Sequence, residues 1–204
     1  MSLFIYHFIK RFFDLTISFI LVVFLMPIYF LLALLVRIDS KGPAFYMPYR
    51  TGYKGRNFKI IKFRTMFIGS DLGPGTTSKN DKRITKFGLF LRKSKLDEIP
   101  QFFNILKGEM SFVGPRPELP KYTKNYKGNE NLILNVKPGI TDFSSIKYSD
   151  FNKLVDNNDP DNFFEKNILR NKNLLRLKYV KEQSLKTDLS ILFNTVFIVI
   201  KNQF

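Results

Sequence analysis

The chain has 204 residues and carries 33 Lys and Arg against 17 Asp and Glu, a formal net charge of +16 at pH 7. It has no cysteine and a single histidine, His7, which excludes disulfides, cysteine-ligated zinc, a Ser-His-Asp triad and multi-histidine metal sites. Acid–base or nucleophilic chemistry must therefore rest on other side chains, and the positive balance favours a polyanionic partner: nucleic acid, an anionic membrane surface or phosphorylated substrates.

The first predicted element is a long apolar helix. Leu15 to Val36, LTISFILVVFLMPIYFLLALLV, run for 22 residues without a charge. As an unbroken helix this stretch would be roughly 33 Å long, enough to cross the core of a bilayer. It is too long for a cleaved signal peptide and has no small-residue cleavage site. Pro27 lies in its middle and lacks the amide that a helix interior uses, so the sequence predicts a kink there.

Basic residues flank this apolar stretch on both sides. Because positive charge is retained in the cytoplasm, both ends are expected on the cytoplasmic side. A helix that enters one leaflet, breaks and returns satisfies both the kink and the charges, and a tilted spanning helix remains the open alternative. The predicted organisation is a re-entrant membrane helix over 1–36 and a cytosolic domain over 37–204. The flanking residues are Lys10, Arg11, Arg37, Lys41, Arg50 and Lys54.

The cytosolic part is predicted to be α+β and mostly helical, with a small β-hairpin. The stretches AFYMPYRTG and NFKIIKFRTM flank the turn-prone YKGR. Alternation with period two places Phe58, Ile60, Lys62 and Arg64 on one face of the second strand, where an exposed charge is the ordinary explanation for Lys62. Residues 69–82, GSDLGPGTTSKNDK, match no phosphate-binding loop and are expected to form a mobile surface loop.

An acidic pair, Asp97 and Glu98, begins the next region of interest. Apolar spacing predicts one helix from Arg83 to Leu91 and a second, short helix that ends at Gly108. Pro100 is tolerated only in a helix's first turn, so this second helix should start near Asp97 and place that carboxylate at or beside the N-cap. There it would cap the helix beside a solvated Glu98, or form part of an anion site with basic neighbours.

The last predicted element is the apolar stretch from Leu189 to Ile200. Its 12 residues are too few to span a bilayer. We expect a core or docking helix, with an amphipathic helix on a membrane surface as the alternative.

These pieces, in this order, resemble the bacterial sugar transferase family of monotopic polyprenyl-phosphate phosphoglycosyl transferases, over about Lys10 to Ile200. Three short stretches depart from the family's usual residues: Met26-Pro27, Met47-Pro48 and Thr141-Asp142-Phe143. None of them touches the central acidic motif, and the sugar is not named by the resemblance. The stretches that carry it are KRFFD, SKGPAFYMPYRTGYKGRNFKIIKFRTM, LRKSKLDEIPQFFNILKGEMSFVGPRPELP, VKPGIT and YVKEQSLKTDLSILFNTV.

The resemblance implies transfer of a sugar-1-phosphate from a UDP-sugar to undecaprenyl phosphate, with release of UMP, at the cytoplasmic face of the bacterial inner membrane. Asp97 corresponds to the family's nucleophile and would form an aspartyl phosphosugar, with Glu98 assisting beside Mg²⁺. Both carboxylates are expected to hold this metal. The expected substrate-binding residues are Lys62, Arg92, Pro115, Arg116 and Pro117, and the expected lipid contacts are Lys10, Arg11 and Pro27.

Two rival functions remain open from the sequence. A membrane-associated glycosyltransferase would make an ordinary glycosidic bond and release UDP rather than UMP. A basic, membrane-tethered nucleic-acid binder is suggested only by the bulk charge, and it would need neither the acidic pair nor the GPRP turn. The prediction is an enzyme with no nucleic-acid partner that acts at the first membrane step of surface glycan synthesis. The resemblance also leaves a homodimer open.

Overall fold

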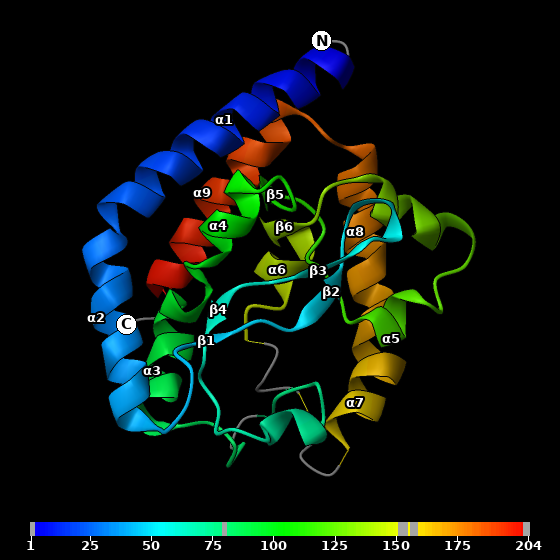
Figure 1. Cartoon of the computed structure of the whole chain (residues 1–204). Coiled ribbons are helices and arrows are strands. Elements are labelled where there is room, and N and C mark those ends of the chain that lie inside the picture. Colours follow the sequence, from blue (N-terminus) through cyan, green and yellow to red (C-terminus); the bar gives the residue numbers. More distant parts are fainter. Residues whose placement is uncertain (1–2, 79–80, 151–154, 156–158, 202–204) are drawn as a thin grey trace.

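The computed structural model of the chain describes residues 3–78, 81–150, 155 and 159–201. Figure 1 shows two apolar helices, α1 and α2, along one side of a domain of short helices and very short strands, with α8 on the opposite side. The predicted α+β, mostly helical class is confirmed. The predicted membrane insertion is not tested by the structure.

The helix pair breaks where the proline predicts it. α1 (Leu3–Phe24) and α2 (Met26–Asp39) meet at an angle of 62°. The amide of Leu25 still donates to Leu21 and that of Tyr29 to Leu25, whereas Pro27 between them has no amide to continue the ladder. No single helix of the described residues is long and apolar enough to cross a membrane. The bent pair of α1 and α2 reaches the length and apolar composition of a membrane span only when both helices are taken together.

α1 turns its more polar side towards the domain. Its buried residues are Tyr6, Asp14, Ser18 and Val22, which recur at helical spacing. The outward face is aromatic and aliphatic: Phe4 is 81% exposed and Phe24 is 76% exposed. An apolar exposed face of this extent is typical of a membrane or protein contact surface. The helix also begins twelve residues before the charge-free run and therefore includes Lys10 and Arg11.

The predicted hairpin forms but its second strand is interrupted. Arg50 pairs with Phe58 at the centre of the register. The next residue of the ladder is Pro48, whose carbonyl accepts from the amide of Ile60 at 3.1 Å but which has no amide to donate in return. Ile61 instead donates to the side chain of Asn104 at 2.9 Å, and pairing resumes where Tyr46 meets Lys62. The strands are β1 (Phe45–Tyr46), β2 (Tyr49–Thr51), β3 (Asn57–Lys59) and β4 (Lys62–Phe63), with a short turn, η1 (Tyr53–Gly55), between β2 and β3.

Helix α3 (Lys86–Ser94) starts three residues later than predicted. The hydroxyl of Thr85 caps it by accepting from the amide of Gly88 at 3.0 Å. Arg83 is held outside the helix because its guanidinium pairs with Asp81 at 2.6 Å. The loop before it contains one short turn, η2 (Ser70–Leu72), and residues 79 and 80 of the predicted loop lie outside the described residues.

The short helix after the acidic pair does not begin at Asp97. α4 (Gln101–Leu106) has Pro100 at its N-cap, and Asp97 lies in a separate 3-10 turn, η3 (Leu96–Glu98). The predicted capping role of Asp97 is therefore wrong. Pro100 itself takes the N-cap with helical φ and ψ, and the acidic pair lies one turn earlier. The predicted end of the helix at Gly108 is close, since that glycine has a φ of +82°.

The remaining elements, from residue 111 onwards, complete the domain. β5 and β6 pair in parallel, Val113 opposite Thr141. α9 docks through Ile191, which is fully buried, as the core or docking prediction requires, while its other face exposes Phe193 and Phe197. These elements are β5 (Ser111–Val113), α5 (Pro120–Thr123), η4 (Gly128–Asn135), β6 (Gly139–Thr141), α6 (Phe143–Lys147), α7 (Pro160–Phe163), η6 (Phe164–Leu169), α8 (Arg170–Lys181) and α9 (Leu185–Lys201).

Two small cores hold the acidic turn in place from either side. One joins α2 to β4 and α3, and in it the hydroxyl of Tyr29 donates to the carbonyl of Ile99 at 2.9 Å. The second joins β3 to α4 and to Met110. The turn at Asp97 and Glu98 is thereby fixed between the apolar helix pair and the hairpin.

Candidate active site

The acidic pair lies on a tight turn that the backbone holds under strain. Lys95, which ends α3 and precedes the turn, has a φ of +60°, an uncommon conformation for a residue with a Cβ. Such a turn separates the directions of two adjacent side chains. The two carboxylates consequently meet different surroundings.

Glu98 is clamped by two cations from other parts of the chain. Its Oε1 accepts from Lys62 at 2.8 Å and also from Arg116. Burial on its own would raise the pKa of this carboxyl, but Arg116 and Lys62 hold the pKa of Glu98 well below its usual range. The same burial lowers the pKa of Lys62, against the pull of Glu98. Lys62 is thus an ion-pair partner rather than the exposed strand charge that alternation suggests.

Asp97 has the opposite character. It is only 8% exposed, and no described residue donates a hydrogen bond to its carboxylate. Burial and the neighbouring Glu98 raise its pKa, although Lys62, Arg92 and Lys95 act the other way. A carboxylate without hydrogen bonds keeps its lone pairs available, which is the condition for a ligand or a nucleophile.

Arg116 is fixed before any substrate arrives. Its guanidinium donates to the carbonyl of Ile140 at 2.8 Å, and its amide donates to the carboxylate of Asp142 at 3.3 Å. The adjoining backbones touch so closely that a Cβ on Gly139 would lie 2.1 Å from the amide nitrogen of Gly114. Only glycine permits this approach. The GPRP turn is therefore rigid through its packing as well as its prolines.

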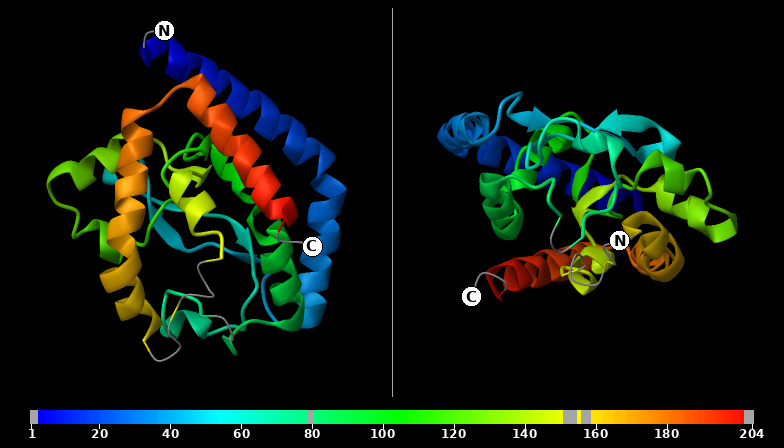
Figure 2. Two further views of the ribbon diagram at one scale, coloured as in Figure 1. Left: turned by 180° about the vertical axis from the view of Figure 1, so that it is seen from behind. Right: turned by 90° about the horizontal axis from the view of Figure 1, so that it is seen from below.

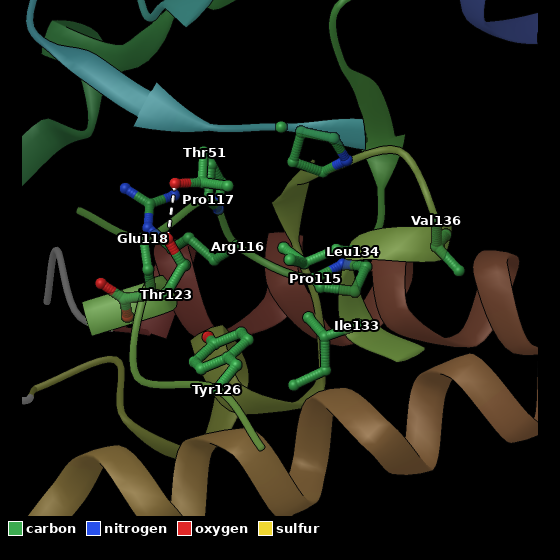
Figure 3. A pocket seen from close by; sticks show the side chains of 12 residues that line it. Thr51, Pro115, Arg116, Pro117, Glu118, Thr123, Tyr126, Ile133, Leu134 and Val136 are labelled. Atoms are coloured by element: carbon green, nitrogen blue, oxygen red, sulfur yellow. Dashed lines mark hydrogen bonds between the residues drawn. The ribbon is translucent and has the colours of Figure 1, made fainter. Parts of the chain in front are cut away.

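Figure 3 shows how this turn is supported from behind. Pro115, Pro117, Tyr126 and Ile133 all line a small cavity of about 10 Å³, scarcely enough for one water molecule. The carbonyl of Pro115 accepts from the amide of Gly139 at 3.1 Å. These two prolines act as packing for Arg116 at this face, and Pro117 also reaches the larger cavity.

Arg92 lies near the acidic pair, but its side chain is bound elsewhere, in part to the loop over residues 69–82. Its guanidinium donates to the hydroxyls of Thr65 at 2.8 Å and Thr77 at 3.1 Å. Burial lowers its pKa, and the charge of Asp97 opposes that effect. The loop itself is tethered, because the amides of Gly75 and Thr76 both donate to the carboxylate of Asp161. The prediction of a surface loop is wrong for Thr76, which is buried.

A cavity of about 220 Å³ opens beside the clamp of Glu98. Lys62 and Arg116 line it, so the predicted binding residues and the cavity share one wall. The sequence did not predict that Arg50 lines this cavity, because Arg50 was interpreted only as a residue that flanks the membrane helix. Lys172 was not predicted at all. The pairing of Arg50 with Phe58 in the hairpin was a usable signal for the first, because a hairpin places Arg50 near Lys62. No sequence pattern marked the second. The lining residues are Arg50, Ile60, Lys62, Gly75, Thr76, Thr77, Arg116, Pro117, Glu118, Leu119, Tyr122, Phe164 and Lys172.

The predicted lipid contacts Lys10 and Arg11 are bound to protein groups. Lys10 pairs with Asp188 of α9 at 2.6 Å, and Arg11 donates to the carbonyl of Ile105 at 2.8 Å and to that of Leu106 at 3.3 Å, at the end of α4. These contacts attach α1 to the domain. A role in lipid binding stays a prediction.

The two carboxylates of the acidic pair are of the kind that bind Mg²⁺ when phosphate oxygens of a substrate complete its ligands. No group of three or more metal-ligating side chains gathers among the described residues. Mg²⁺ is usually held by one or two carboxylates together with water and phosphate oxygens. Asp97 offers such a carboxylate, whereas one oxygen of Glu98 is already shared by two cations.

Comparison with known proteins places the chain in one family, since the family described as bacterial sugar transferase matches residues 5–202. The undecaprenyl-phosphate glucose phosphotransferase of Komagataeibacter xylinus is 37% identical over 195 residues, 92% of this chain and 35% of that protein. The UDP-glucose:undecaprenyl-phosphate glucose-1-phosphate transferase of Klebsiella pneumoniae is 38% identical over 192 residues, 92% of this chain and 39% of that protein.

A third relative carries a different sugar in its name. The UDP-N-acetylgalactosamine-undecaprenyl-phosphate N-acetylgalactosaminephosphotransferase of Aeromonas hydrophila is 32% identical over 196 residues, 94% of this chain and 44% of that protein. The chain thus spans less than half the length of these three relatives, while the family match takes in the acidic pair, its clamp and the helices on both sides. This chain belongs to the bacterial sugar transferase family.

Proposed function

We propose that this chain transfers a sugar-1-phosphate from a UDP-sugar to undecaprenyl phosphate and releases UMP. The observation that carries the proposal is that two adjacent carboxylates have different partners. Glu98 is ion-paired to Lys62 and Arg116, and Asp97 is buried without a hydrogen bond from the described residues. The names of the three relatives support the donor and acceptor classes.

The first step is attack by a carboxylate oxygen of Asp97 on the phosphorus that bears the sugar. A bond forms between that oxygen and phosphorus, the bond to the bridging oxygen breaks, and UMP leaves with the electron pair. Lys62 and Arg116 face the cavity with positive charge that is already in position when negative charge moves to the leaving group. Glu98 acts as a positioning residue that holds both cations.

The second step frees Asp97. An oxygen of the lipid phosphate attacks the same phosphorus, the bond to the Asp97 oxygen breaks, and the carboxylate is regenerated. Mg²⁺ would be held by Asp97 and the remaining oxygen of Glu98, and when bound it supplies charge that offsets the repulsion between carboxylate and diphosphate.

The acceptor is proposed to reach the site along the exposed apolar faces of α1, α2 and α9. The side chains of Phe24, Phe30 and Phe197 are all largely exposed, at 76%, 72% and 66%. A bent pair inserted in one leaflet of the cytoplasmic membrane would bury these faces in lipid and leave the cavity in the cytoplasm.

The test uses donor without acceptor. After incubation with a UDP-sugar and Mg²⁺, intact-mass measurement of wild type should show a phosphosugar adduct, and UMP should be released in a matching burst. Asp97→Asn keeps the side chain's size but is a far weaker nucleophile, so it should fold and show neither. Asp81→Asn, which alters a carboxylate paired with Arg83, is the control and should retain the adduct.

Two results would contradict the proposal. One is release of UDP instead of UMP in the complete reaction, which would identify an ordinary glycosyltransferase. The other is an undiminished adduct on Asp97→Asn, once deamidation back to Asp is excluded by mass.

A further inference from the structure

Lys172, from the first turn of α8, lines the same cavity as Lys62 and Arg116. Its ammonium lies over the ring of Phe164, 5.2 Å from the centroid, and over that of Tyr148 at 5.7 Å. Such placement over two rings holds a flexible side chain in one region. Lys172 is therefore a fixed positive charge in the wall of the cavity.

The charges of this cavity are strongly unbalanced. Four cationic side chains line it, and Glu118 is the one acidic residue among the described lining residues. The carboxylate of Glu118 is itself paired with the buried guanidinium of Arg176 at 2.5 Å. The cations that line the cavity are Arg50, Lys62, Arg116 and Lys172. A cavity of this kind fits a multiply charged anion such as a diphosphate.

The cations of the cavity have different neighbours. Lys62 and Arg116 also bind Glu98, so the part of the cavity that they line adjoins the acidic pair. Lys172 instead lies over the ring of Phe164, which packs against Tyr122 with the ring centroids 5.1 Å apart, and both rings are almost fully buried. Figures 1 and 2 show α8 on the opposite side of the domain from α2, the second helix of the apolar pair.

We propose that Lys172 binds the phosphate that remains with the nucleoside, the group that departs as UMP. This inference rests on the proposed function, in which the bond between the bridging oxygen and the sugar-bearing phosphorus breaks. The electron pair then resides on an oxygen of the departing phosphate. Lys172 offsets this charge, whereas Lys62 and Arg116 serve the phosphate that is transferred.

The protonation of Lys172 makes this role measurable. Burial lowers the pKa of Lys172 to about 8, against the charge of Glu118, with Arg176 and Arg116 adding to the lowering and Asp142 opposing it. The phosphate of UMP is a dianion throughout pH 7 to 9, because its second pKa is about 6. Binding the dianion favours the protonated lysine, so affinity for UMP should be full below pH 8 and fall above it.

The experiment is an equilibrium titration of UMP into the full chain at pH 7 and pH 9. If only the protonated lysine binds, wild type should lose about tenfold more affinity over this range than Lys172→Arg, whose charge persists. Lys62, whose pKa is also lowered by burial, and Arg50 and Arg116 are common to both proteins, so the difference isolates Lys172. Lys172→Gln should bind UMP about tenfold more weakly at pH 7.

The matched control is Lys178→Gln, on the same helix, where the side chain is 53% exposed. It should keep both the affinity and the pH dependence of wild type. Titration with geranyl phosphate distinguishes the two sources of phosphate, and it should be unaffected by Lys172→Gln. The inference is overturned if the acceptor analogue alone is affected, or if Lys172→Arg retains the wild-type pH profile.

The proposed function is judged separately by the nucleotide that the complete reaction releases. Release of UMP by wild type together with unchanged UMP affinity in Lys172→Gln would overturn the inference and leave the function standing. Release of UDP, with no binding of UMP, would overturn both.

Discussion

Two neighbouring carboxylates differ here because their partners differ. Glu98 meets Lys62 from the hairpin and Arg116 from the GPRP turn, so its pKa falls well below its usual range. Asp97 meets neither at hydrogen-bond distance, and burial raises its pKa. Pushing the pKa values of adjacent acids apart is how one site assigns them separate roles. Glu98 is the partner of two cations, and Asp97 is the group to which the proposed function gives the reactive role.

The residue-scale prediction concerns Glu98→Gln. The amide has no charge, so Lys62 and Arg116 lose the partner that orients them, and a displacement of about 1 Å costs about 10²-fold in rate. We expect kcat to fall by about this factor with little change in fold. The pKa of Lys62, already lowered by burial, should fall further, so that the rate declines at lower pH on the alkaline side than in wild type.

A pH–rate profile beside a thermal unfolding curve is the measurement for Glu98→Gln. Glu165→Gln, at an exposed position of η6, serves as the control and should match wild type in both. A normal kcat in Glu98→Gln would remove the anchoring role.

At the scale of elements, the carboxylate of Asp161 joins the loop before α3 to α7. Asp161 accepts from the amides of Gly75 at 3.0 Å and Thr76 at 2.8 Å, and it pairs with Lys121 at 2.7 Å. Thr76 and Thr77 line the cavity, so the position of this loop sets part of its shape. Two segments far apart in sequence thus form one wall.

Asp161→Asn should loosen that wall. The amide side chain accepts hydrogen bonds more weakly than a carboxylate and does not pair with Lys121. Hydrogen exchange at Gly75 and Thr76 should quicken, and the KM for the donor should rise by severalfold while kcat changes less. Asp71→Asn, at an exposed position of the same loop, is the control. Unchanged exchange in Asp161→Asn would show that other contacts hold the loop.

At the scale of the whole molecule, the two terminal helices are locked together by a buried polar cluster. Asp188 of α9 accepts from Tyr6 at 3.0 Å, from Tyr179 at 2.9 Å and from Lys10 at 2.6 Å. Tyr179 also lies 3.2 Å from the carbonyl of Val113, the residue before the GPRP turn. The apolar helix pair is therefore attached firmly to the domain that carries the site.

The whole-molecule prediction is topological. Because the chain has no native cysteine, single cysteines at Leu3 and Lys41, at the two ends of the helix pair, can be labelled cleanly. If the pair is re-entrant, an impermeant thiol reagent should reach both only from the cytoplasmic side of membrane vesicles. Labelling of the Leu3 position from the opposite side would establish a spanning helix instead.

Several features of the fold are set by residues that are close together in the chain, and these could be predicted from the sequence. Pro27 breaks the apolar helix because it lacks an amide, the turn-prone YKGR closes a hairpin, and Gly108 follows a short helix. The family was also readable from the sequence motifs, and the roles of the acidic pair, Lys62, Arg92 and Arg116 that they imply stay predictions. Each of these features depends on neighbours a few residues away.

Only the tertiary structure decided which carboxylate is clamped and what else lines the cavity. Glu98 acquires its pKa from Lys62 and Arg116, 36 and 18 positions away, and Asp97 is buried without such partners. Lys172 enters the same cavity from a helix 74 positions beyond Glu98 (172 − 98) that no local pattern relates to it. Desolvation and ion pairing depend on distances through space, which the packing of the hairpin, the GPRP turn and α8 sets and the linear order of residues does not.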